Sequence, residues 1–338
     1  MKTIRITRQG FPNESMHSYF NFFIFVLSKK YNVVIDPVNP DLIIYSNLNF
    51  NENQIDTKLN DKPKVHDHFD MSKKFLFVSG EVSDFDSMLH LDNHWSIGYQ
   101  KLNHEKYLRQ PSGIFDVWTL FDESRLTDSP LNWLTTNRDY NTIKNRNTGF
   151  CSITQASHND YREKVFDKLC EYKTVSSSGP WKQNLFGDDT LNRHQWINHL
   201  YSGRMDGLGY REKIEFFQKY KFNISIHFTN TPNILQEKIF HSFFSGAIPI
   251  FYGNESIYDE GFNPESFINL HEFENLDDFL TLIKKIDSDD KLYEKYIKSP
   301  IYLDNKLPEY MDFDYTLAFL EKIIELRKHL LRISQILF

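Results

Sequence analysis

The segment from Tyr220 to Phe273 constrains the fold more than any other part of this chain. Lys221 to Phe228 carries β-branched and aromatic residues in partial alternation, and Leu235 to Phe244 has apolar residues at helical spacing. Ala247 to Tyr252 is a short apolar run. Together these patterns predict a strand, a helix and a buried strand in that order. Such a unit requires a parallel sheet, and open α/β sheets bind ligands at the carboxyl ends of their strands.

Two charged residues lie at the predicted start of the helix in this unit. They are Glu237 and Lys238. Helix N-termini favour anions, a lysine can pair with phosphate, and a carboxylate can accept hydrogen bonds from hydroxyl groups. The pair therefore suits a ligand that carries both phosphate and sugar hydroxyls. Without further support, an adjacent Glu and Lys on a helix would more often belong to a solvated face.

The support comes from a longer pattern around this pair. Its members are Phe228, Asn230, Glu237, Lys238, Gly246, Ile248, Pro249, Ile250 and Gly253, followed by Phe262, Asn263, Pro264, Ser266, Phe267, Ile268 and Asn269. The composite resembles the donor-binding signature of the α-1,3/4-fucosyltransferases, glycosyltransferase family 10. That signature joins F-E-N, a Tyr-x-Thr-Glu-Lys helix start, G-x-[IV]-P-[IV]-x-x-G and F-N-P-x-S-F-[IV]-N. This chain departs from it at Thr229, Ile234 and Gln236, close to the expected donor.

The resemblance implies a fold and an activity. The fold is α/β of the GT-B type, with two facing Rossmann-like domains, here followed by a C-terminal helix. The activity is inverting transfer of fucose from GDP-fucose to a hydroxyl of an acceptor glycan. GDP-fucose is then a substrate, and neither a cofactor nor a metal is required. Two alternatives stay open: another GDP-linked or deoxy-sugar donor on the same fold, and a non-catalytic glycan or nucleotide binder.

The candidate general base is Glu81. It follows Gly80 directly after the predicted strand Lys74 to Ser79, so its carboxylate stands at a strand's carboxyl end beside a turn-permissive residue. Alone, a turn glutamate is most often merely solvated. The family has a Glu at the matching strand end, proposed to remove the acceptor proton, although Val82 stands here where the family often has Asn.

The candidate diphosphate site adds Arg162 to Lys238. Arg162 begins the predicted helix DYREKVFDKLCEY, which follows a strand-like run from Gly149 to Ile153. A strand, a loop and a helix start again place a cation where a diphosphate could bind, and the family has an arginine at the matching position.

The resemblance assigns roles to the remaining candidates. It implies that Glu237 holds donor hydroxyls or stabilises the cationic sugar, and that Asn230 and Gln236 contact the donor. Ser178 and Gly179, in the run SSSG, are further donor contacts, through backbone amides that could cradle phosphate. Acceptor-binding residues are left open.

Three polar clusters could suggest a metal, and we expect none of them to bind one. His66, Asp67 and His68 are neighbours along the chain, and adjacent residues rarely point at one ion. Asp84/Asp86 and Asp312/Asp314 have the D-x-D spacing of another transferase architecture, but neither directly follows a strong apolar strand.

Length and composition predict two domains. The chain has 338 residues, 40% of them hydrophobic and 16% aromatic, which is enough for two cores. Strand-like and helix-like patterns alternate through Thr3–Thr7, Glu14–Lys30, Tyr31–Asp36, Leu42–Ser46 and Lys74–Ser79. The polar run from Thr135 to Thr148 reads as a hinge. We therefore expect an acceptor-binding domain at 1–140 and a nucleotide-sugar-binding domain, with the C-terminal helix, at 147–338.

Charge and cysteine content limit the partners and the compartment. A formal net charge of −7 argues against a nucleic-acid-binding surface. Cys151 and Cys170 form no disulfide framework, and no export signal or membrane-spanning run is evident, so we expect a cytoplasmic protein.

The C-terminal segment, Thr316 to Phe338, is amphipathic and basic. It suits three roles: completing the core, pairing with another chain, or lying on an anionic membrane. The expected partners are therefore a nucleotide sugar and an acceptor glycan, with peripheral contact at the inner membrane surface or self-association as further roles of this helix.

Overall fold

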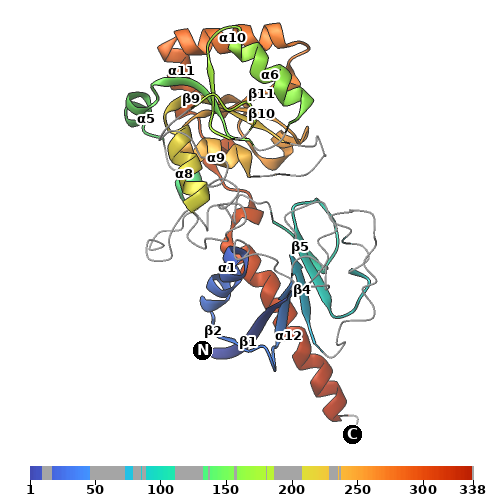
Figure 1. The fold of residues 1–338 in the computed structure, drawn as a ribbon. Coiled ribbons are helices and arrows are strands. Elements are labelled where there is room, and N and C mark those ends of the chain that lie inside the picture. Colours follow the sequence, from blue (N-terminus) through green and yellow to red (C-terminus); the bar gives the residue numbers. More distant parts are fainter. Residues whose placement is uncertain are drawn as a thin grey trace. The chain divides into compact units, whose positions relative to one another are not determined.

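The computed structural model describes residues 1–9, 17–45, 73–78, 85, 89–110, 132–135, 138–155, 158–179, 181–185, 208–227, 235 and 237–336. The chain divides into two compact units. The first unit combines Met1–Pro111 with Glu309–Phe338, and the second unit is Ser112–Pro308 (Figure 1).

The first unit is built on a six-stranded parallel sheet of order β2-β1-β3-β4-β5-β6. Its strands are β1 (Lys2–Gln9), β2 (Tyr31–Ile35), β3 (Leu42–Tyr45), β4 (Phe75–Val78), β5 (His94–Gly98) and β6 (Tyr107–Arg109), with helix α1 (His17–Ser28) between β1 and β2. All five strand pairings are parallel, as the alternating patterns predict. The chain order along the sheet reverses between β1 and β3, which is the doubly wound arrangement.

The C-terminal helix α12 (Phe313–Ile336) belongs to the first unit. The ring of Phe313 packs against Phe22 and Phe25 of α1. The Gln110 side chain, after β6, donates to the Thr316 hydroxyl at 2.5 Å, and both residues are fully buried. The expected ranges 1–140 and 147–338 therefore differ from this division. A helix more than 200 residues away in sequence completes the first core, and no local pattern reports such a contact.

The second unit contains a five-stranded parallel sheet of order β11-β10-β9-β7-β8. Its strands are β7 (Gly149–Ile153), β8 (Val175–Ser177), β9 (Tyr220–Ile226), β10 (Ile248–Tyr252) and β11 (Ile268–Asn269). Its α-helices are α4 (Asn132–Thr135), α5 (Tyr140–Arg146), α6 (Asp160–Cys170), α8 (Leu208–Phe217), α9 (Lys238–Ser245), α10 (Leu276–Ser288) and α11 (Asp290–Lys298). Short 3₁₀ turns lie at Ile257–Glu260, Pro264–Ser266, Leu270–Glu272 and Leu303–Asn305, and a further one at Glu309–Met311 in the first unit.

Helices cover both faces of this second sheet. Helix α6 packs with α10, and α8 packs with α9 (Figure 1). Right-handed crossovers place α6 and α8 on opposite faces, because β7 leads to β8 on one side and β8 leads back to β9 on the other. The predicted strand–helix–strand unit is confirmed as β9-α9-β10, with Phe222 opposite Ile248 and Ile224 opposite Ile250.

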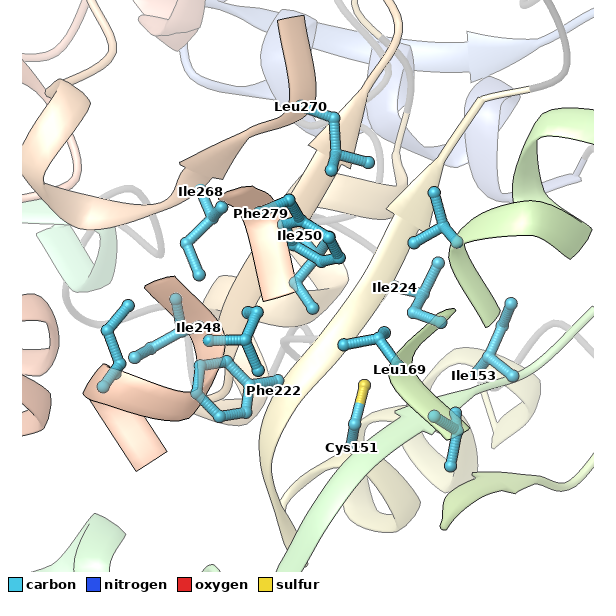
Figure 2. Packing of buried hydrophobic residues seen from close by; sticks show 14 of the residues in the cluster. Cys151, Ile153, Leu169, Phe222, Ile224, Ile248, Ile250, Ile268, Leu270 and Phe279 are labelled. Carbon is cyan, nitrogen blue, oxygen red and sulfur yellow. The ribbon is translucent and has the colours of Figure 1, made fainter. Parts of the chain in front are cut away.

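The apolar side of the sheet forms the main core of the second unit. Leu169 of α6 and Phe279 of α10 pack in this core with Cys151 of β7 and Phe222 of β9 (Figure 2).

Local signals set the ends of two helices in this unit. Asn159 caps α6 through its side chain, and Gly246 ends α9 with a φ of 78°, a conformation that glycine adopts without strain.

The run expected to be a hinge is a folded part of the second unit. Asp139 caps α5, and Tyr140 and Ile143 are buried in the core of this unit. The run looks polar because only one side of this short helix faces the core. The division of the chain falls instead between Pro111 and Ser112.

Candidate active site

The second sheet has a topological switch point between β7 and β9. Strand β8 lies on one side of β7, while β9 and β10 continue on the other. The helices that follow β7 and β9 therefore leave toward opposite faces, and open α/β sheets bind ligands at the carboxyl ends of the strands at such a point. Arg162 and Lys238 are the cations nearest the starts of those two helices, α6 and α9.

Arg162 reaches from α6 to the end of β9. Its backbone N–H donates to the capping oxygen of Asn159 at 2.9 Å, and its Nη2 donates to the Ile226 carbonyl at 3.0 Å. The side chain is only 1% exposed. Burial lowers the pKa of Arg162 to about 10, so the guanidinium is still charged at neutral pH.

Lys238 reaches the same carbonyl from the other side. Its Nζ donates to the Ile226 oxygen at 3.0 Å, so the two cationic nitrogens lie within about 6 Å of each other. Burial, with the charges of Arg162 and Lys213, lowers the pKa of Lys238 to about 7, although Glu237 opposes the shift. Two cations share one neutral acceptor here, and a doubly charged anion would be a better partner for both.

Glu237 stands beside this pair with its charge retained. Burial alone would raise the pKa of its carboxyl, but Lys238, Lys213 and His227 outweigh burial and hold the pKa below its ordinary value. Glu237 occupies the N-cap position of α9 without a side-chain capping bond.

Lys213 and His227 are site residues that the sequence patterns did not reveal. Lys213 lies on α8, and its charge acts on Glu237, Lys238 and His241. His227 follows β9 directly and is buried, with its ring 5.3 Å from that of Phe251. A signal existed for His227, because it continues the every-second-residue series Asn223, Ser225, His227 along one face of β9.

Ser178 and Gly179 lie at the carboxyl end of β8, next to the switch point. Ser178 is fully buried, its hydroxyl is 2.6 Å from that of Thr154, and its N–H donates to the Ile153 carbonyl. A Cβ on Gly179 would lie 2.5 Å from the Gln155 nitrogen, so only glycine allows this approach of backbone to backbone. Both residues tie β8 to the end of β7; their contact with a donor stays a prediction.

Several predicted residues lie outside the described residues: the general base Glu81, the donor contacts Asn230 and Gln236, and the clusters His66–His68 and Asp84/Asp86. Within the ranges that the structure describes, no group of three or more His, Cys, Asp or Glu side chains is arranged to hold a metal ion. Across those same ranges, no helix combines the length and apolar character needed to cross a bilayer.

A family model matches the part of the chain that holds this site. Residues 142–301 match glycosyltransferase family 10 (fucosyltransferase) C-term. The chain is 26% identical over 321 residues to alpha-(1,3)-fucosyltransferase FucT of Helicobacter pylori, covering 89% of this chain and 61% of that protein. It is 28% identical over 135 residues to alpha-(1,3)-fucosyltransferase B of Drosophila melanogaster, covering 40% and 28%. The chain thus spans less than two thirds of the length of these curated relatives.

Solved structures establish the fold class. A crystal structure of alpha1,3-fucosyltransferase aligns with a TM-score of 0.66 at 22% identity, covering 96% of this chain and 90% of that chain. A second, of alpha1,3-fucosyltransferase with GDP-fucose, aligns with a TM-score of 0.64 at 21% identity, covering 96% and 91%. Two doubly wound parallel sheets of this kind define a GT-B protein, as expected from the sequence. Over residues 142–301 the chain is thus similar to the fucosyltransferases of glycosyltransferase family 10.

Proposed function

We propose that this chain is an inverting glycosyltransferase that moves fucose from GDP-fucose to a hydroxyl of an acceptor glycan. The observation that carries the proposal is the convergence of Arg162 and Lys238 on the Ile226 carbonyl at the switch point of the second sheet. A diphosphate placed there meets two cations from two helix starts. Donor identity rests on the relatives, whose structures include one with GDP-fucose and one with GDP.

The chemistry needs a base on the acceptor side and positive charge on the donor side. In the proposed reaction, Glu81 removes the proton of an acceptor hydroxyl, and that oxygen attacks the anomeric carbon of fucose as the bond to the diphosphate breaks. Negative charge then grows on the departing GDP, where Arg162 and Lys238 neutralise it. Glu237 accepts hydrogen bonds from donor hydroxyls or stabilises the positive charge on the sugar ring.

No metal ion is required in this proposal. In other transferases a metal ion neutralises the negative charge of the departing diphosphate. In this proposal the two cations that meet at the Ile226 carbonyl take the place of that metal ion. We expect full activity in excess EDTA. Loss of activity that manganese restores would contradict this and point to one of the acidic or histidine clusters.

Arg162→Ala and Lys238→Ala test the diphosphate site. Each removes a charge-assisted contact worth about 1.5–3 kcal/mol, so the Kd for GDP should rise by roughly tenfold to a hundredfold in calorimetry. Lys295→Ala is the matched control, because Lys295 pairs with Glu265 on the surface of the same unit. Wild-type GDP affinity in both site variants would refute the assignment.

A nucleotide-sugar panel tests the donor. A ligand that binds the folded chain raises its thermal unfolding midpoint by mass action. GDP-fucose should stabilise the chain more than GDP-mannose or UDP-glucose at equal concentration, and GDP should be released when acceptor glycans are added. Selective stabilisation by a different GDP-sugar would keep the architecture and replace the donor.

A further inference from the structure

A buried polar seam lies beneath the two cations. We use this name for Ser152 of β7, Asn223 and Ser225 of β9, and Ser242 of α9. All four are at most 2% exposed. The opposite face of β9 is apolar, with Phe222, Ile224 and Ile226 in the main core. The seam therefore occupies a place where apolar side chains would be expected.

Hydrogen bonds connect the whole seam. The Asn223 amide donates to the backbone oxygen of Ser152 at 3.1 Å and lies 3.0 Å from its hydroxyl. The Ser242 hydroxyl is 2.7 Å from Asn223 Oδ1 and 2.6 Å from the Ser225 hydroxyl. Both serine hydroxyls also lie within 3.3 Å of the Lys238 carbonyl. Three strand and helix elements are thus linked through side chains, and the links end on the backbone of Lys238.

The seam acts at the start of α9, where the N-cap side chain does not hold the helix. Glu237 makes no capping bond, so the first turn of α9 is not held by its own N-cap side chain. Ser225 directly precedes Ile226, whose carbonyl receives the Lys238 ammonium and the Arg162 guanidinium. Strand β9 therefore contacts both the Lys238 backbone, through the Ser225 hydroxyl, and the Lys238 side chain, through the Ile226 carbonyl.

Stability alone does not account for such a network. Replacing bonded polar pairs by apolar groups of the same shape is often neutral or stabilising, whereas a satisfied buried network fixes one geometry. An apolar interface would let α9 slide or rotate slightly on the sheet. A shift of about 1 Å at its first turn would move the Lys238 ammonium relative to Arg162.

We propose that Asn223, Ser225 and Ser242 are positioning residues for nucleoside diphosphate binding, acting through Lys238. This rests on the proposed function, since it assumes that the anion bound at the switch point is a nucleoside diphosphate. None of the three needs to touch the ligand. Their role is to hold the Lys238 ammonium close to the Arg162 guanidinium, so that both groups can contact the diphosphate at the same time.

Two sets of variants test the seam. Ser242→Ala removes the contacts to Asn223 and Ser225, and loss of a buried hydrogen bond should raise the Kd for GDP by about three- to tenfold. At position 225, Ser225→Thr keeps the hydroxyl and Ser225→Val has the same shape without it. We expect Ser225→Val to bind GDP at least threefold more weakly than Ser225→Thr, whatever cost the added methyl group imposes on both.

Ser245→Ala is the control for a merely structural effect. Ser245 is a fully buried serine on the same helix, but its hydroxyl bonds Ser242 O and the Ala247 N–H at the C-terminal end of α9. It should lower the thermal unfolding midpoint without changing the Kd for GDP. A second readout is the pH dependence of GDP binding, whose midpoint should move upward in Ser242→Ala as Lys238 gains access to water.

The outcomes separate the two proposals. If wild-type chain binds GDP and both Ser242→Ala and Ser225→Val bind it equally well, the positioning role is wrong while the proposed function stands. If the wild-type chain does not bind GDP, the proposed function is wrong, and the positioning role that rests on it is wrong as well. Should Ser242→Ala not fold, the Ser225→Thr and Ser225→Val pair decides the question alone.

Discussion

At the scale of single residues, the surroundings of Lys238 favour its neutral form, whereas its proposed role in binding diphosphate needs the charged form. Burial and the neighbouring cations Arg162 and Lys213 favour the neutral amine, and they bring its pKa to about 7. A bound diphosphate favours the ammonium form. We therefore expect diphosphate binding above neutral pH to be accompanied by the uptake of a proton.

The first prediction is that GDP affinity falls as pH rises from about 7 to about 9, approaching tenfold per pH unit at the alkaline end. The sign follows because the empty site loses the Lys238 proton in this window, whereas Arg162, with a pKa of about 10, keeps its charge through most of it. Calorimetry across the range measures the slope. In Lys238→Met, binding should be weaker and nearly independent of pH. A flat profile in the wild-type chain would show that Lys238 does not titrate.

The second prediction concerns Glu81, which follows β4 outside the described residues. If it removes the acceptor proton, Glu81→Gln should lower turnover by about a hundredfold to ten-thousandfold. The Kd for GDP-fucose should stay the same, because the base acts on the acceptor. Glu105→Gln, an exposed glutamate of the same unit, is the control. Unchanged turnover in Glu81→Gln would remove this residue from the mechanism.

At the scale of elements, the ends of β7 and β8 are held together by a close backbone approach. A Cβ at Gly179 would lie 2.5 Å from the Gln155 nitrogen, and backbone cannot rotate away as a side chain can. The third prediction is that Gly179→Ala destabilises the chain by about 1–3 kcal/mol in urea unfolding, the usual cost of overpacking. GDP affinity should fall as well, because the loop after β8 is part of the switch-point edge. Unaltered stability would mean that the approach is looser than the structure indicates.

Helix α12 makes its described contacts through its first half. Thr316 bonds Gln110, Glu321 pairs with Lys30, and the Ile323 and Ile324 carbonyls accept from Lys74. Leu326, a turn later, is 48% exposed. Among the side chains of this helix that the structure describes, which end at Leu326, the contacts with the first unit therefore lie well before Arg332.

The fourth prediction is that a chain lacking Arg332 to Phe338 keeps its thermal midpoint and its Kd for GDP. Its sedimentation with phosphatidylserine vesicles or its self-association should decrease, because the removed segment is apolar and basic. Phosphatidylcholine vesicles control for charge. Aggregation or unfolding of the shortened chain would show that the segment completes the core.

At the scale of the whole molecule, the chain has two compact units, and the candidate donor site lies in the second. A ligand that contacts one unit stabilises that unit by mass action, by about 2.7 kcal/mol at a hundred times the Kd. The fifth prediction is that saturating GDP slows hydrogen exchange strongly in β7, β9 and α9. Exchange in β1 and β3 should change much less. Equal protection of both units would show that they open as one cooperative body.

The sequence alone determined the elements and their order. Apolar periodicity, capping residues and glycine positions act over a few residues, so local patterns suffice to predict β9-α9-β10 and the helix that starts near Arg162. The same local logic placed Arg162 and Lys238 at helix starts. The family pattern then indicated the GT-B class, which the solved relatives confirm.

Tertiary structure alone decided which of these residues meet. Strand order is a property of long-range pairing, and the meeting of Arg162 and Lys238 on Ile226 follows from the placement of β9 beside β7. The series Asn223, Ser225, His227 alternates like the solvent face of a half-buried strand, yet it is buried, because parallel crossovers cover both faces of the sheet. Helix α12 likewise belongs to the first unit through contacts with residues that are distant in sequence. Local patterns record how each segment can fold, whereas burial depends on which distant segment covers it.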